Sequence, residues 1–186
     1  MKPGGGRRKG KRFERKVVAI MREAFDLDVK DCYRTPLSGG HFAASKEDPG
    51  DLFLGQVFQM SMPKPLCIEC KNSKNFNITR FHKFDEPKSS WGETRALHQV
   101  MKAAGTDKAP VLIFNHGQKI WCCCPEVLRH QKVTGLFFVF NGVKFCMTLF
   151  EEVVAGWVKL QDPNQRILHN DLQSLGGLLK RKRRVA

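Results

Sequence analysis

The stretch "LCIECKN", residues 66–72, places a Glu and a Lys two positions apart within an apolar run. Its composition predicts a β-strand, in which successive side chains point to opposite faces of the sheet. On such a strand Cys67, Glu69 and Lys71 share one face, and Cys70 lies on the other. The two cysteines therefore point apart, while the acidic and basic side chains lie together.

This separation argues against a zinc or redox role for the C-x-x-C spacing of Cys67 and Cys70. A zinc knuckle holds both thiolates on a tight turn, and a redox C-x-x-C stands at the N-terminus of a helix. Residues 122–124 are three further cysteines in an apolar run, and the chain has seven in all. We expect reduced, buried thiols that pack as small apolar side chains.

The charge of the chain favours a polyanionic partner. It has 32 Lys and Arg against 18 Asp and Glu, a formal net charge of +14. Nucleic acid is the first candidate and an anionic membrane surface the second. We expect a flexible basic arm at residues 1–12, a single domain at 13–160, and a C-terminal extension with a basic tail at 161–186.

Targeting signals are not evident. The basic start lacks the apolar core of a signal peptide, and no apolar run approaches the ~20 residues of a membrane span. We therefore expect a cytoplasmic protein that does not cross a membrane.

The predicted elements alternate between helix and strand. Apolar residues at helical spacing predict a helix over residues 13–25, and a second helix that ends at Gly105. Asn141-Gly142 is a preferred pair for a tight hairpin turn. The predicted strands begin at Asp51 and cover residues 56–62, 66–72, 110–115, 119–124, 136–140 and 143–150. This order predicts an α/β fold, with a central mixed β-sheet flanked by helices.

Acidic residues near this sheet suit a hard metal ion. Asp51 begins a strand expected to lie beside that of Glu69, and carboxylate oxygens are the ligands that Mg²⁺ prefers. Lys71 can stabilise phosphate charge, and Glu14 from the first helix can complete the cluster. Two simpler interpretations stay open: Glu14 favours the positive end of a helix dipole, and Asp51 serves a Pro-Gly turn.

The motifs Phe13-Glu14, Pro49-Gly50-Asp51 and Glu69-Cys70-Lys71 resemble, in this order, those of the PD-(D/E)xK nucleases. The resemblance covers roughly residues 12–115, from the first helix to the strand after the second helix. It implies a restriction-endonuclease-like core and a Mg²⁺ cofactor for which Mn²⁺ substitutes. Within the superfamily the chain looks most like archaeal and phage Holliday-junction resolvases, which carry a Glu in a basic first helix.

The resemblance also implies roles for individual residues. Glu14, Asp51 and Glu69 would hold the metal, with the backbone carbonyl of Cys70 as a further ligand, and Lys71 would be the catalytic lysine. The expected catalytic set also includes Ser38 and Gln99. Each has a simpler alternative: Ser38 as a turn residue and Gln99 as a solvated helix position. The expected DNA-binding residues are Arg7, Arg8, Lys9, Lys11, Arg12 and Arg15.

Together these features predict a metal-dependent, structure-selective endonuclease that resolves four-way DNA junctions as a homodimer. Two alternatives stay open at this point. One is another nuclease of the superfamily, of the nicking or restriction type. The other is a non-catalytic, basic nucleic-acid-binding protein.

Overall fold

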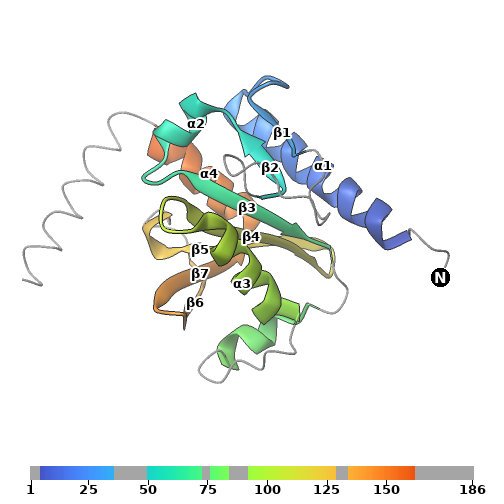
Figure 1. The fold of residues 1–186 in the computed structure, drawn as a ribbon, viewed down its shortest axis with the longest axis vertical. Helices are drawn as coiled ribbons and strands as arrows, with labels where there is room; N and C mark the ends of the chain where they lie inside the picture. The colour runs from blue at the N-terminus through green and yellow to red at the C-terminus, as the bar shows by residue number, and fades with distance from the viewer. Residues whose placement is uncertain (1–4, 36–49, 73–75, 84–91, 129–133, 162–186) are drawn as a thin grey trace, which may run out of the picture.

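A computed structural model describes residues 5–35, 50–72, 76–83, 92–128 and 134–161. Its centre is a five-stranded sheet in the order β3-β4-β5-β7-β6, in which β3 and β4 are parallel and the other neighbours antiparallel (Figure 1). The strands are β3 (Leu66–Lys71), β4 (Ala109–His116), β5 (Lys119–Pro125), β6 (Leu136–Phe140) and β7 (Val143–Leu149). The predicted α/β fold with a mixed central sheet is confirmed, and it is compatible with a restriction-endonuclease-like core.

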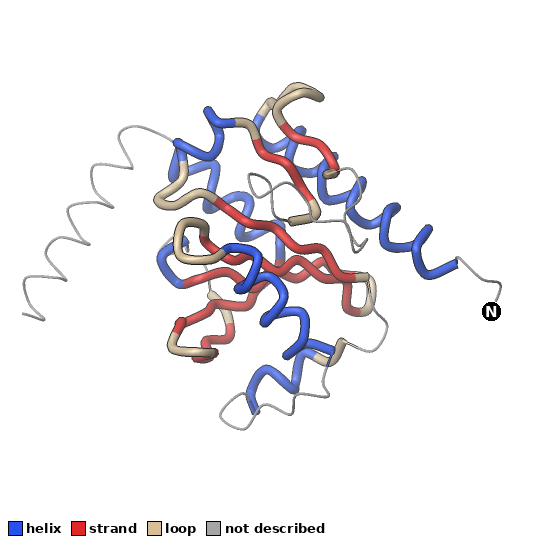
Figure 2. Tube along the Cα trace, viewed as in Figure 1, coloured by secondary structure: helices blue, strands red, loops and turns tan. Residues whose placement is uncertain are grey.

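Helices flank this sheet (Figure 2). Core packing places α1 (Gly5–Phe25) and α4 (Phe150–Gln161) on one face and α3 (Gly92–Ala104) on the other. The described residues also form two short 3-10 helices, η1 (Ile78–Lys83) and η2 (Glu126–Leu128), and the short helix α2 (Gln56–Ser61). Among the helices of the described residues, none has the length and apolarity that crossing a membrane requires.

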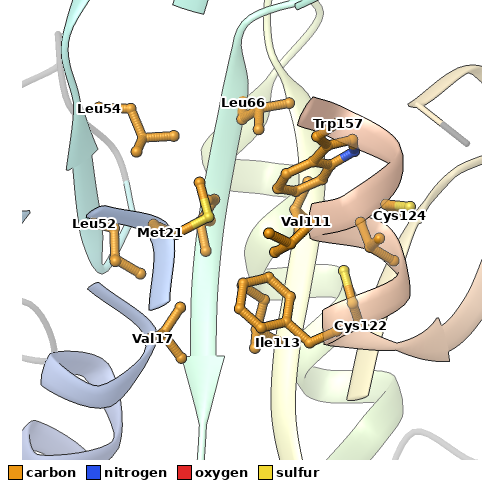
Figure 3. Packing of buried hydrophobic residues seen from close by; sticks show 14 of the residues in the cluster. Val17, Met21, Leu52, Leu54, Leu66, Val111, Ile113, Cys122, Cys124 and Trp157 are labelled. Carbon is orange, nitrogen blue, oxygen red and sulfur yellow. The ribbon is translucent and has the colours of Figure 1, made fainter. Parts of the chain in front are cut away.

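Strand alternation divides the core into two layers. Ile68 and Cys70 of β3 pack with α1 and α4, whereas Cys67 packs with α3 on the opposite face. Figure 3 shows the first layer, where Met21 of α1 and Trp157 of α4 lie against the sheet. The predicted separation of the two cysteines is therefore confirmed.

All seven cysteines are buried and free of disulfides. Burial, followed by the nearby Glu69 charge, raises the pKa of Cys67 to about 12. Burial likewise holds the pKa of Cys70 well above its ordinary value. Because only a thiolate attacks a disulfide or binds zinc, these neutral thiols serve as core side chains.

A small second sheet lies next to β3. It pairs β1 (Cys32–Arg34) with β2 (Leu52–Leu54) in antiparallel register. The backbone N–H of Asp51, just before β2, donates to the carbonyl oxygen of Ile68 at 2.7 Å. This bond brings the predicted turn residue Asp51 against the central strand.

Gly50 makes that close approach possible. Its φ of +133° lies where residues with a side chain are strained. A Cβ atom on Gly50 would also lie 2.8 Å from the carbonyl oxygen of Ile68. The Pro-Gly-Asp stretch therefore needs glycine at this position for steric as well as conformational reasons.

The strand predicted over residues 56–62 is wrong: most of this segment forms α2 (Gln56–Ser61). The apolar residues of such a short run do not distinguish a strand from one helical turn. Phe58 points into the core, while Val57 and Met60 are 87% and 73% exposed. The side chain of Gln59 accepts from the N–H of Leu66 at 2.7 Å and so ties α2 to the start of β3.

The two outer helices also differ from the sequence-based prediction. α1 begins at Gly5, so residues 5–12, which we expected to belong to a flexible arm, form its first turns. Lys and Arg are good helix formers, and the Asn72 amide donates to the Lys9 carbonyl at 3.2 Å. α4 follows β7 directly and was not predicted, although Glu151 and Glu152 suit the positive end of a helix.

The predicted turn positions are confirmed. Asn141 and Gly142 have φ values of 48° and 76°, as a tight turn between β6 and β7 requires. Gly105, with a φ of 58°, follows the last residue of α3.

Replacement of Gly50 by Ala should destabilise the fold more than replacement of Gly117. Both glycines have positive φ, but no atom lies within 4 Å of a Cβ built on Gly117. We expect Gly117→Ala to cost about 1 kcal/mol in free energy of unfolding and Gly50→Ala to cost about 2–4 kcal/mol, since the clash adds to the strain. Chemical denaturation measures both, and equal losses would contradict the close approach at Ile68.

Candidate active site

Three acidic side chains are buried where β2 begins and β3 ends. Glu14 of α1, Asp51 and Glu69 of β3 are 8%, 6% and 5% exposed. Buried carboxylates are costly unless cations or hydrogen-bond donors face them. The fold therefore assembles the three acids that the sequence analysis selected, and it surrounds them with donors.

Asp51 is the most perturbed of these acids. Burial raises its pKa to about 7, and the Glu69 charge, then the Glu14 charge, act in the same direction. The backbone N–H of Cys70 donates to Asp51 Oδ2 at 2.8 Å and opposes the rise, as does the Lys71 ammonium. Such convergence of like charges is typical of functional sites.

Glu69, Lys71 and Gln99 form a hydrogen-bonded triangle. Lys71 Nζ donates to Glu69 Oε1 and, at 3.1 Å, to Gln99 Oε1. Gln99 Nε2 donates to Glu69 Oε1 at 2.8 Å. Glu69 and Lys71 thus share one face of β3 as predicted, and α3 brings Gln99 to that face.

Arg34 is a site residue that the sequence analysis missed. Its guanidinium Nε donates to Glu14 Oε2, and the two side chains form an ion pair that is largely buried. Arg34 is the last residue of β1, so its position depends on the pairing of β1 with β2. The available signal in the sequence was a cation four positions before Ser38, between the first helix and the strand that begins at Asp51.

The predicted DNA-binding residues lie along the first turns of α1. Arg8, Lys9, Arg12 and Arg15 are exposed, and Lys11 is half-buried. Ser38 lies outside the described residues, as does the side chain of Arg7.

The donor set suits a hard divalent cation. Carboxylate oxygens are the preferred ligands of Mg²⁺, and a cation would offset the repulsion that raises the Asp51 pKa. Within the described residues, however, no three His, Cys, Asp or Glu side chains form a ready-made metal cluster. Glu69 and Glu14 are engaged by Lys71 and Arg34 instead. Metal ligation therefore requires these carboxylates to exchange partners.

Comparison with known protein families assigns the chain to a nuclease family. The family described as "Phage putative PDDEXK endonuclease" matches residues 5–137. The chain belongs to this family. The matched range of this PDDEXK endonuclease contains Glu14, Asp51, Glu69 and Lys71. The match supports the interpretation of the chain as a nuclease of the PD-(D/E)xK type. No curated protein and no solved structure matches the chain.

In this PDDEXK endonuclease, Asp51→Asn should stabilise the metal-free fold. A folded pKa of about 7 against an ordinary value of 3.8 means that stability falls as the pH rises through this interval. One pKa unit is about 1.4 kcal/mol. Allowing for screening, we expect Asp51→Asn to raise the free energy of unfolding by roughly 1–3 kcal/mol at pH 8. Thermal unfolding in a chelator, repeated at lower pH, measures the gain.

The gain should shrink as the pH approaches 4, because Asp51 is then protonated in the folded state. Asp51→Ala is the matched control: it also removes the charge but leaves the Cys70 N–H without its acceptor. It should therefore gain less than Asp51→Asn. A lower stability of Asp51→Asn at pH 8 would contradict the electrostatic cost assigned to this carboxylate.

Proposed function

We propose that this PDDEXK endonuclease is a Mg²⁺-dependent, structure-selective enzyme that resolves four-way DNA junctions by phosphodiester hydrolysis. The observation that carries the proposal is the Glu69–Lys71–Gln99 triangle beside the buried Asp51 carboxylate. A basic helix that also supplies Glu14 borders this cluster.

The cluster offers distinct roles to its members. Asp51, Glu69 and Glu14 would hold the cation, with the Cys70 carbonyl as a further ligand; Mn²⁺ would substitute for Mg²⁺. The cation supplies Lewis acidity and lowers the pKa of the attacking water. Lys71 Nζ, which Gln99 and Glu69 orient, would face the charge that builds up on the phosphate oxygens.

Branch selectivity would come from DNA shape. The exposed cations of α1 suit contacts to phosphates, which position the substrate without reading its bases. Resolution of a four-way junction needs two symmetric cuts, and the described part of each chain holds one such cluster, so we propose a homodimer. The enzyme would act in the cytoplasm, of the host cell if it is viral.

A synthetic four-way junction, incubated with the protein and Mg²⁺ or Mn²⁺, tests the substrate. We expect paired incisions near the branch point and little cleavage of a linear duplex of the same sequence. Equal cleavage of the duplex would instead support a nicking or restriction-type endonuclease. Size-exclusion chromatography reports whether the active species is a dimer.

The double variant Glu69→Ala/Lys71→Ala tests the catalytic cluster. Because it removes one negative and one positive charge, the net charge that attracts DNA is unchanged. We expect cleavage to fall by a factor on the order of 10³ or more, while the affinity for the junction in a chelator is retained.

Glu126→Ala/Lys144→Ala is the matched control. Lys144 Nζ and Glu126 Oε2 form an exposed ion pair with a distance of 3.0 Å, and neither residue belongs to this cluster. The control should cleave normally. Undiminished cleavage by Glu69→Ala/Lys71→Ala would place the chemistry elsewhere, and no cleavage by the unmodified protein would support a non-catalytic binder.

Binding should weaken steeply as salt is added. Each phosphate contact contributes about −0.9 to the slope of log affinity against log salt concentration. Replacing Arg12 and Arg15 by Ala should therefore make the slope shallower by about 2, whereas Lys159→Ala, exposed at the end of α4, should leave it unchanged. A flat salt response of the unmodified protein would exclude phosphate-dominated binding.

A further inference from the structure

A pocket of about 340 Å³ lies beside α1, where it meets the β4–β5 turn and the start of α4. The residues that line it fall into two classes. The apolar residues are Ile20, Ile120, Leu149 and Phe150, and the polar ones are Lys16, Gln118, Lys119 and Glu151. None of the site residues that the structure describes lines this pocket, so it is separate from the cluster of Glu14, Asp51, Glu69 and Lys71.

The polar residues of the pocket are available to a ligand. All four are exposed, and within the described part of the chain none of their side chains makes a hydrogen bond or ion pair. The apolar residues are half-buried or, for Phe150, buried. The pocket therefore combines apolar walls with two cations, an amide and a carboxylate at its rim.

Helix geometry connects this pocket to the active site. Successive residues of an α-helix turn by about 100°, so Lys11, Arg15, Arg12 and Lys16 follow one another around α1. Lys11 starts this series on the side of Glu14, and Lys16 ends it at the pocket. The series forms a path of cations across the solvent-facing side of the helix.

A DNA strand that leaves the catalytic cluster can follow these cations over α1. Its phosphates would meet the basic side chains in turn, because such contacts follow the backbone. Glu14 and Lys16, two residues apart, lie on opposite sides of this helix, which is about 10–12 Å wide with its side chains. A strand that crosses α1 therefore arrives with its next bases at the pocket.

We propose that this pocket receives the base of an unpaired nucleotide at the branch point of the DNA substrate. The apolar walls would cover the faces of the base, and Lys16 and Lys119 would bind the flanking phosphates. Its volume is near the lower end of ligand pockets, which begin at about 300 Å³. Insertion costs least for a base that is already unpaired, and this gives a physical source of selectivity for branched DNA.

The carboxylate of Glu151 makes the pocket selective. It disfavours an isolated phosphate in the pocket but accepts hydrogen bonds from an exocyclic amine, as carboxylates do with cytosine. Gln118 can donate to, or accept from, the same base edge. Cytosine, adenine and guanine should therefore bind better than thymine, which has no exocyclic amine.

The inference rests on the proposed function only in taking DNA as the ligand, and a binding assay in a chelator tests it without cleavage. The probe is a duplex with one unpaired 2-aminopurine, whose fluorescence rises when the base leaves the stack. We expect the full-length protein to raise this fluorescence and to bind the bulged duplex about tenfold more tightly than the perfect duplex, a difference of ~1.4 kcal/mol.

Lys16→Glu/Lys119→Glu should abolish the fluorescence rise and the tenfold preference. Lys30→Glu/Lys159→Glu is the matched control: it makes the same change in net charge at exposed lysines outside the pocket. The control variant should bind both duplexes more weakly, to the same extent, and keep its preference for the bulged duplex. Glu151→Ala should remove the discrimination between unpaired cytosine and thymine.

The possible failures are distinguishable. Equal binding of bulged and perfect duplex with no fluorescence rise, in a protein that still cleaves junctions, overturns the pocket and leaves the proposed function intact. A preference that survives Lys16→Glu/Lys119→Glu also overturns it. If the protein binds no DNA at low salt, the pocket assignment and the proposed function both fall.

Discussion

The short connection between Asp51 and β3 organises the candidate active site. The Asp51 N–H bonds to the Ile68 carbonyl, and the Asp51 carboxylate accepts from the Cys70 N–H. Because Ile68 and Cys70 flank Glu69, these two bonds set the distance between the two central carboxylates. Gly50 permits the approach since it has no Cβ to meet the Ile68 carbonyl. The position of the acids is thus determined by the backbone, and not by flexible side chains.

The cost of this arrangement is electrostatic. Burial and the neighbouring acids raise the Asp51 pKa, and the fold offsets the remaining charge with Lys71 against Glu69 and Arg34 against Glu14. Buried charges held in this way are poor evidence of stability and better evidence of function. Lys71 and Arg34 thus neutralise two of the three buried acids in the free protein.

The sequence predicted the parts of the site that depend on local periodicity. Strand alternation was enough to place Glu69 and Lys71 on one face, because the period of two holds along any strand. Residues 56–61 were assigned wrongly because their apolar residues do not distinguish a strand from one helical turn. The pairing of Arg34 with Glu14 was not predictable, since it depends on how β1 lies against α1. Local patterns therefore identified the chemistry, and long-range packing supplied its partners.

In the proposed function, Asp51 and Glu69 together would bind a catalytic divalent cation. Titration of the DNA-free protein with Mn²⁺, followed by the electron paramagnetic resonance signal of free Mn²⁺, tests it most directly. We predict that each chain takes up a single Mn²⁺ ion saturably and that Mg²⁺ competes for the same site. Asp51→Asn should lose this uptake although the variant stays folded. Unchanged uptake by Asp51→Asn, or junction cleavage by a protein that takes up no Mn²⁺, would contradict it.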